Sequence, residues 1–216
     1  MTLSVTSTLP TWLSFDATTG VLSGTPLNAH VGTQAVTVQA EDTAGATATQ
    51  TFTITISNTN DAPTITSTAP TSVDEDSAYS YTVQTSDVDV GDSVSLTGTT
   101  IPSWMAFDAE TGVLSGTPSN SDVGSHSVTI TAEDDAGATA TDTFSITVAN
   151  TKDAPTIDST AVTSVDEDSV YSYTATGADV DSGDTLTLSA SDPSWLTFTP
   201  STGVLTGTPT NDEVGS

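Results

Sequence analysis

The sequence contains almost no basic side chains. Among its 216 residues, Asp and Glu number 28, Arg is absent and Lys152 is the single lysine, so the formal net charge is −27. One cation cannot neutralise a run of phosphate groups, which argues against nucleic acid and anionic membrane surfaces as partners. The charge indicates instead a protein that binds cations or works in high salt.

Two further absences narrow the class of protein. Cysteine is missing, which excludes a disulfide scaffold and thiolate metal sites. No apolar run approaches the roughly 20 residues of a membrane-spanning helix, and no charged segment followed by an apolar one opens the chain. We therefore expect a soluble, strongly acidic protein with no segment that inserts into a membrane.

Apolar residues alternate with polar ones in several segments. Residues 52–56, 79–83 and 144–148 each place aromatic or β-branched side chains at every second position, with Ser or Thr between them. This period of two is typical of strands with one face buried, and no segment has the spacing of an amphipathic helix. The sequence predicts a folded, all-β protein.

The chain repeats itself with a period of 92 and then 91 residues. The heptapeptide Gly-Val-Leu-Ser-Gly-Thr-Pro at residues 20–26 returns at 112–118 and, with one Ser changed to Thr, at 203–209. The tryptophans keep the same register, each three residues before a phenylalanine: Trp12, Trp104 and Trp195. A period this long, with several short strands and Gly/Asp turns, indicates a β-sandwich domain rather than a solenoid coil.

One repeat is complete in this sequence. We expect residues 62–153 to form it, residues 1–61 to be the C-terminal portion of a preceding repeat, and residues 154–216 to be the N-terminal portion of a following one. We call these segments repeat two, repeat one and repeat three. The chain looks like a slice of a longer tandem array, and both terminal portions should be unstable alone because each exposes unpaired sheet edges and half a core.

The acidic residues gather at fixed points of the repeat, mostly near predicted strand ends. The acidic loop at 87–92 returns at 179–184, and the linker at 58–61 returns at 150–153. We call these two linkers, with the loops beside them, the first and the second junction. Two carboxylates about 4 Å apart repel by about 4 kcal/mol at an effective dielectric of 20, so such clusters are costly without a cation. Hard oxygen ligands without His or Cys favour Ca²⁺ over zinc or copper, and over Mg²⁺ with its tight octahedral geometry.

Three features resemble a cadherin repeat. They are the Phe-Asp-Ala-Thr-Thr-Gly-Val-Leu run at 15–22, the Ala-Glu-Asp strand ends at 40–42 and 132–134, and the Asn-x-Asn-Asp-Ala-Pro linker at 58–63. The Trp-Leu/Met-x-Phe stretch and the Ser-Gly-Thr-Pro run bring the chain closer to the dystroglycan-type cadherin-like and immunoglobulin-like tandem repeats of bacterial surface proteins. The resemblance covers the whole chain.

This resemblance implies seven-stranded Greek-key β-sandwiches, incomplete in the terminal repeats, with Ca²⁺ held between successive domains. Carried over by position, it implies these ligands for the first junction: Asn58, Asn60, Asp61, Asp87, Asp89 and Asp134. For the second junction it implies Glu75, Asp122, Asn150, Asp153, Asp179 and Asp181. Calcium and the neighbouring repeats of the same chain are then the direct partners.

The sequence departs from the cadherin pattern at both junctions. The family's Leu-Asp-Arg-Glu segment corresponds to Leu-Asn-Ala-His at 27–30, so the first junction loses both carboxylates there. At the second junction, Lys152 stands where the first has Asn60, which places the lysine beside an expected cation site. Either junction can therefore bind fewer ions, or bind them more weakly, than the family pattern implies.

Simpler interpretations stand beside these. The acids could be solvated surface charge, and the tryptophans could be sugar-stacking platforms, although their repeated placement favours a sandwich core. Asp16, Asp108 and Glu110 fit tight turns before glycine better than metal ligation. The two histidines, His30 and His126, fall at positions that do not repeat, and we expect both at the surface.

Two functional hypotheses follow. The first is a calcium-rigidified spacer within a longer bacterial cell-surface or secreted adhesin, acting in cell adhesion outside the cell. The second is direct recognition, in which the repeats bind a polysaccharide or one another in the presence of calcium. We expect no enzymatic activity, because the sequence has no Gly-x-Ser-x-Gly, no phosphate-binding loop and no repeated histidine constellation.

Overall fold

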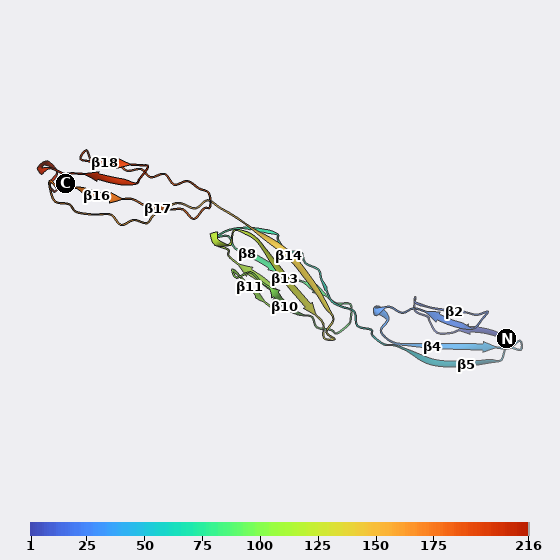
Figure 1. The fold of residues 1–216 in the computed structure, drawn as a ribbon. Coiled ribbons are helices and arrows are strands. Elements are labelled where there is room, and N and C mark those ends of the chain that lie inside the picture. The colour runs from blue at the N-terminus through green and yellow to red at the C-terminus, as the bar shows by residue number, and fades with distance from the viewer. Residues whose placement is uncertain (216) are drawn as a thin grey trace.

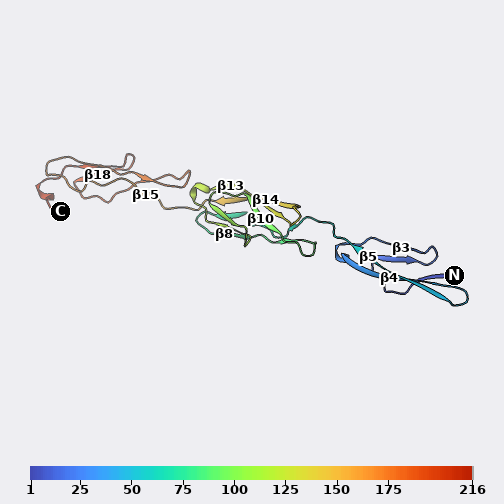
Figure 2. The ribbon, with the colours of Figure 1, turned by 90° about the horizontal axis from the view of Figure 1, so that it is seen from below.

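The computed structural model describes residues 1–215, which form three segments of β-structure in a row. Figures 1 and 2 show the segments following one another from the N-terminus at one end to the C-terminus at the other. No α-helix occurs among residues 1–215, and the helical turns there are short 3₁₀ helices: η1 (Asn28–His30), η2 (Asn120–Asp122) and η3 (Asn211–Glu213). The prediction of an all-β fold is confirmed.

Repeat two forms a β-sandwich. Its strands are β6 (Thr64–Ile65), β7 (Ser72–Asp74), β8 (Tyr79–Thr82), β9 (Thr85–Ser86), β10 (Ser95–Thr100), β11 (Met105–Asp108), β12 (Val113–Gly116), β13 (Gly124–Glu133) and β14 (Thr139–Ala149). One sheet has the order β10-β13-β14-β7 and the other has the order β11-β12-β8, while β6 pairs with β9. All pairs are antiparallel except β7 with β14, which are parallel.

The core of repeat two comes from the inward positions of the alternating segments. Leu114, Val128, Ile130 and Ile146 have at most 1% of their surface exposed, and Tyr79 and Tyr81 pack against them in the same cluster. The tyrosines therefore lie where the period-two pattern predicted. The Tyr79 hydroxyl has a partner at the edge of the core, where it donates a hydrogen bond to the Pro70 carbonyl at 2.9 Å.

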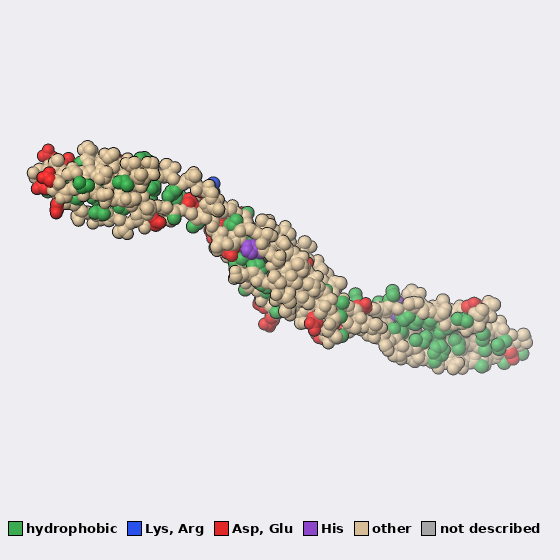
Figure 3. Space-filling model, in the orientation of Figure 1, with side chains coloured by type: hydrophobic (Ala, Val, Ile, Leu, Met, Phe, Trp, Pro, Cys, Tyr) green, Lys and Arg blue, Asp and Glu red, His purple; other side chains and the backbone are tan. Residues whose placement is uncertain are grey.

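Repeat one contains five strands and little buried apolar surface. They are β1 (Thr2–Val5), β2 (Leu13–Asp16), β3 (Val21–Gly24), β4 (Gly32–Glu41) and β5 (Thr47–Ile56), in a sheet β1-β4-β5 and a hairpin β2-β3. Leu13 and Val36 are buried, whereas Val21 is 53% exposed and Phe52 is 36% exposed. Hydrophobic side chains are in view over this segment in Figure 3.

Repeat three, described as far as residue 215, also contains five strands there. They are β15 (Thr156–Ile157), β16 (Tyr171–Thr174), β17 (Gly177–Ala178), β18 (Leu196–Thr199) and β19 (Val204–Gly207). An open groove of about 750 Å³ lies beside Val165, Tyr171 and Trp195. In repeat two, the counterpart of Val165 is Val73, which pairs with Val148 of β14. The groove thus lies where repeat two has its last strand.

The glycine of the Ser/Thr-Gly-Thr-Pro run has a packing role. A Cβ placed on Gly24, Gly116 or Gly207 would lie 1.8–2.2 Å from the carbonyl oxygen of the repeat's tryptophan. No real Cβ comes that close to a backbone oxygen, so only glycine lets the paired strands approach here. This contact explains why the glycine and the tryptophan recur together in all three repeats.

The turns before Gly20 and Gly112 are built as expected. Both glycines have φ near +70°, a conformation that other residues rarely adopt. The Asp16 carboxylate accepts a hydrogen bond from the Thr18 backbone amide at 2.8 Å, and Asp108 accepts one from the Glu110 amide at 2.9 Å. Asp16 and Asp108 therefore stabilise the turns of their hairpins.

We predict that Gly116→Ala destabilises repeat two. The added methyl collides with the Trp104 backbone carbonyl, and relieving the collision should cost about 2–3 kcal/mol. Scanning calorimetry should show the transition of repeat two about 10 °C or more lower. Ser125→Ala, at an exposed position of β13, serves as the control, and equal melting of the two variants would contradict the packing role.

Candidate metal centres at the repeat junctions

At the first junction, Asp89 is the central carboxylate. It follows β9, is 4% exposed, and its Oδ2 accepts a hydrogen bond from the Asp61 backbone amide of the linker at 2.7 Å. The Asn28 side-chain amide of repeat one donates to Asp61 Oδ2 at 2.6 Å and to Asp89 Oδ1 at 3.1 Å. Asp87 Oδ1 accepts from the Asp89 amide at 2.9 Å, while Asp87 Oδ2 is buried without a partner in the described chain. Repeat one, linker and repeat two therefore meet at these carboxylates.

Asp134 forms a second contact of the first junction. It follows β13, is 5% exposed, and its Oδ2 accepts a hydrogen bond from the Asn60 side-chain amide at 2.8 Å. Its Oδ1 accepts the backbone amides of Ala136 and Ala138 at 2.9 and 2.8 Å. The Asn60 amide, more than these backbone amides, holds the pKa of Asp134 below its usual value. The linker thus touches repeat two through two consecutive residues, Asn60 and Asp61.

At the second junction, Glu75 is the most buried acid. It follows β7, is 1% exposed, and its Oε1 accepts the Thr151 backbone amide of the linker at 2.6 Å. Its Oε2 is buried and has no hydrogen-bond partner among residues 1–215. A buried carboxylate oxygen without a partner is costly, which indicates that a ligand belongs there.

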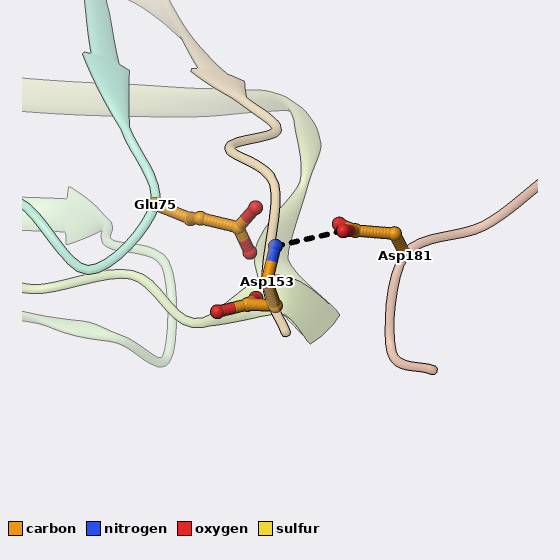
Figure 4. A group of neighbouring side chains, drawn as sticks. All are labelled: Glu75, Asp153 and Asp181. Carbon is orange, nitrogen blue, oxygen red and sulfur yellow. Dashed lines mark hydrogen bonds between the residues drawn. The ribbon is translucent and has the colours of Figure 1, made fainter. Parts of the chain in front are cut away.

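Asp153 and Asp181 lie beside Glu75. Asp181 is 6% exposed and accepts the Asp153 backbone amide at 2.8 Å and the Asn150 side-chain amide at 2.8 Å. Figure 4 shows Glu75 and Asp181 approaching the linker residue Asp153 from opposite sides. One carboxylate oxygen from each of the three residues lies within 4.8 Å of the other two. Repeat two, linker and repeat three each contribute one acid to this cluster.

The pKa values of Asp153 and Asp181 move in opposite directions. Burial, followed by the charges of Glu75 and Asp181, raises the pKa of Asp153. The Asn150 amide and the Asp153 backbone N–H lower the pKa of Asp181. Asp181 is therefore stabilised as a carboxylate, whereas Asp153 is held among negative charges. A divalent cation would remove this conflict, because it offsets the repulsion that acts on Asp153.

The residues of the second junction fit Ca²⁺. The cluster offers only hard oxygen donors, it carries three carboxylates, and one of its oxygens is buried and unpartnered. Glu75, Asp153 and Asp181 would hold the ion. The ion would supply positive charge between two repeats.

Of the remaining expected ligands, Asp179 and Asp122 make local contacts and Asn58 makes none in the described chain. Asp179 Oδ1 accepts the Asp181 amide at 3.0 Å. Asp122 Oδ2 caps η2 by accepting the backbone amide and the hydroxyl of Ser119 at 2.9 and 2.7 Å, which lowers its pKa. Asn58 is exposed, and its side chain makes no hydrogen bond within residues 1–215. The structure therefore gathers most, but not all, of the expected residues at their junctions.

Two participants were missed by the sequence analysis. Asn28 ties repeat one to both Asp61 and Asp89, although its segment was expected only to lose carboxylates. Asp184 accepts a hydrogen bond from the Lys152 ammonium. Its match to Asp92 in the repeated acidic loop was the signal that could have identified it.

The tryptophans and histidines pack together. Trp104 is half-buried, packs against the core of repeat two and makes edge-to-face contacts with Tyr79 and His126, as a structural role predicts. The expectation that both histidines are ordinary surface residues was wrong. Both are half-buried: His30 Nδ1 accepts the Leu27 amide at 2.9 Å, and His126 Nε2 lies 2.6 Å from the Asp122 carbonyl oxygen.

Comparisons with known proteins agree with this arrangement. The family described as “Putative Ig domain” matches residues 1–57, 62–149 and 154–216. The serine-rich adhesin for platelets of Staphylococcus aureus (strain MRSA252) is 34% identical over 128 residues, which is 59% of this chain and 9% of the adhesin. The chain thus spans less than a tenth of that curated relative.

Solved cadherin structures share the fold. Mouse cadherin-23 EC22-24 matches with a TM-score of 0.59 and 17% identity, covering 97% of this chain and 75% of that one. The protocadherin GammaB4 extracellular domain matches with a TM-score of 0.52 and 18% identity, covering 99% and 40%. These structures confirm tandem cadherin-like domains. Within residues 1–215 there is no helix with the length and apolarity that crossing a membrane demands.

We predict that Asp153→Asn has opposite effects with and without calcium. Because the folded-state pKa of Asp153 is raised, its contribution to stability is present below the unfolded pKa and lost as the pH rises through the folded pKa. At pH 7 without calcium, removing this charge should raise the melting temperature by about 2–5 °C. With millimolar Ca²⁺, the variant should gain less stability than the native chain.

Asp192→Asn is the matched control, because Asp192 is an exposed acid away from the linkers. It should leave both melting temperatures unchanged. A D153N chain that melts lower than the native chain in calcium-free buffer would contradict the electrostatic conflict at this junction.

Proposed function

Since the chain belongs to the “Putative Ig domain” family, we propose that it is a run of calcium-stiffened spacer repeats in a longer bacterial adhesin at the cell surface or secreted. Its role in cell adhesion is mechanical, holding a distal binding domain away from the cell. The likeness to a staphylococcal adhesin supports the adhesive setting. The cadherin-like arrangement of domains supports the spacer geometry.

The observation that carries this proposal is the unpartnered oxygen of Glu75. Glu75 belongs to repeat two, yet one of its carboxylate oxygens lies within 4.8 Å of an oxygen of Asp153 in the linker and of one of Asp181 in repeat three. An ion bound by the three residues would bond both repeats to the linker at once. The same ion would offset the repulsion that otherwise drives these carboxylates apart.

Stiffening is the expected mechanical result. Without an ion, the described hydrogen bonds that cross each junction run mainly through linker residues, such as Thr151 to Glu75 and Asp153 to Asp181. A linker held by a few hydrogen bonds can bend, whereas one with ligands on both sides of an ion is fixed. Extracellular calcium modules have dissociation constants of roughly 10⁻⁴–10⁻³ M. Export from a low-calcium cytosol would therefore stiffen the chain.

The proposed ligand sets keep the expected residues. At the first junction they are Asn58, Asn60, Asp61, Asp87, Asp89 and Asp134, with the unpartnered Asp87 Oδ2 as the best available donor atom. At the second they are Glu75, Asp122, Asn150, Asp153, Asp179 and Asp181, with Asp122 contributing the oxygen that its cap leaves over. An asparagine side chain coordinates a cation through its carbonyl oxygen. Asn60 and Asn150 donate hydrogen bonds through their NH2 groups here, so each side chain would have to turn to present its carbonyl oxygen to the ion.

The hypothesis of direct polysaccharide recognition or self-association gains no support. It requires an exposed aromatic or amide-rich patch, whereas the tryptophans are half-buried beside tyrosine or histidine rings. The open groove beside Tyr171 and Trp195 lies where repeat two has its last strand. We propose a non-catalytic role, since the acids at the junctions form hydrogen bonds with the linkers.

We predict that calcium stiffens and stabilises the full chain. Millimolar Ca²⁺ should raise the melting temperature and increase the maximum dimension in small-angle scattering, because bridged linkers sample fewer bent conformations. A chelator should reverse both effects. A scattering profile and melting temperature that do not respond to calcium would overturn the proposal.

We predict that Glu75→Gln weakens calcium binding at the second junction about tenfold or more, because one ligand charge is lost. Glutamine keeps a carbonyl oxygen for the Thr151 amide, so folding without calcium should persist by circular dichroism. Calorimetric titration of the full chain measures the affinity. Glu110→Gln, in the exposed β11–β12 turn, is the charge-matched control and should bind as the native chain does.

A further inference from the structure

We propose that the Lys152 ammonium serves as a built-in cation at the second junction, so that this junction binds one calcium ion fewer than its carboxylates would otherwise hold. The inference rests on the proposed function. It assigns a regulatory role to a residue that no ligand set includes. Calcium is then needed at the buried Glu75 cluster, while the outer side of the junction is neutralised by the chain itself.

The two linkers form a natural comparison, because they differ at one position. Residues 58–61 read Asn-Thr-Asn-Asp and residues 150–153 read Asn-Thr-Lys-Asp. The contacts around this position are repeated: the backbone amide of the linker aspartate donates to Asp89 at 2.7 Å in one junction and to Asp181 at 2.8 Å in the other. The substitution of Lys152 for Asn60 therefore sits in two linkers that make the same aspartate contact, although Asp134 contributes only to the first junction and Glu75 only to the second.

The lysine faces three carboxylates of repeat three. Its ammonium forms an ion pair with Asp184, and the charges of Asp181 and Asp179 add to that of Asp184 in raising the pKa of Lys152. The lysine side chain is 76% exposed, whereas Glu75 is 1% exposed. The ammonium thus covers the outer side of the acidic loop, and the unpartnered Glu75 oxygen remains on the buried side.

The three corresponding carboxylates of the first junction have no ammonium beside them within the described residues. There the counterparts are Asp87, Asp89 and Asp92. Asp89 accepts hydrogen bonds from the Asn28 amide and the Asp61 backbone amide, while the Asn60 amide donates to Asp134 instead. Burial, followed by the charges of Asp89 and Asp135, raises the pKa of Asp92. A loop with uncompensated charge at one junction and an ammonium at the other should differ in its demand for calcium.

Two chemical properties of lysine produce this difference. Asparagine offers a carbonyl oxygen that can ligate Ca²⁺, whereas the lysine ammonium has three N–H donors and no acceptor. The ammonium also repels a divalent cation that approaches the same carboxylates. Lys152 therefore removes one ligand and adds one like charge, and both changes oppose an outer ion.

The consequence is a difference in calcium dependence along the chain. The second junction keeps an ionic tie between linker and repeat three when calcium is scarce, because the Lys152–Asp184 pair needs no metal. The first junction has no ion pair among its described contacts and is tied by neutral amide donors alone, those of Asn28, Asn60 and Asp61. Calcium should therefore change the order of the first junction more than that of the second.

The test is the calcium stoichiometry of the full chain, measured by equilibrium dialysis and calorimetric titration. Lys152→Asn should add one bound ion, or tighten the weakest site about tenfold, and Asn60→Lys should remove one ion. Lys152→Arg keeps the charge and should bind as the native chain does. Positions 60 and 152 are exposed, and melting curves in calcium-free buffer will verify that each variant folds.

The outcomes separate this inference from the proposed function. A native chain that binds no calcium at millimolar concentration refutes the spacer proposal and the inference with it. A native chain that binds calcium, with K152N giving the same stoichiometry and affinities, overturns the role of Lys152 alone. Spin labels across the second junction add an independent measurement: without calcium, K152N should broaden the distance distribution, and an unchanged distribution would also count against the inference.

Discussion

Repulsion between carboxylates at the linkers is the constraint on which the rest of this structure depends. Each linker passes between buried acids, with Asp89 and Asp134 at one junction and Glu75 and Asp181 at the other. Burial raises the cost of uncompensated charge, so every such oxygen must find a donor or a cation. Backbone amides of the linker, asparagine side chains and Lys152 meet much of this demand, and the unpartnered oxygens of Glu75 and Asp87 mark the part that they leave unmet.

The sandwich provides the frame that holds these acids in place. The acids follow strand ends: Glu75 comes after β7, Asp134 after β13 and Asp89 shortly after β9. Strands packed on a rigid core fix the direction of the loops that follow them. Equivalent loops therefore leave successive sandwiches in the same direction. The glycine that lets the β11–β12 hairpin form against the tryptophan carbonyl belongs to this frame. In the proposed function, stable sandwiches joined by linkers that bind a cation would suit a spacer, because mechanical stiffness would then depend on few bonds at each junction.

Much of the fold could be predicted from the sequence, because sheet patterns are local. Alternation at residues 79–83 placed Tyr79 and Tyr81 in the core, and the repeated heptapeptide marked the domain period. The site was less accessible. Resemblance to cadherin repeats named Glu75, Asp153 and Asp181 for one junction, but the contribution of Asn28 and the capping contact of Asp122 depend on where loops lie in space. The histidines were misplaced for a related reason, since their partners Trp12 and Trp104 lie on other segments.

By itself, the sequence determined the charge, the strand alternation, the repeat period and the clustering of acids at strand ends, since each is a property of neighbouring residues. Only the tertiary structure decided which acids share a junction and which atoms remain without partners. Thr151 binds Glu75 across 76 residues of chain, and Asn28 binds Asp89 across 61. Contacts over such separations depend on how whole strands pack and where the loops between them close, and no local pattern records that geometry.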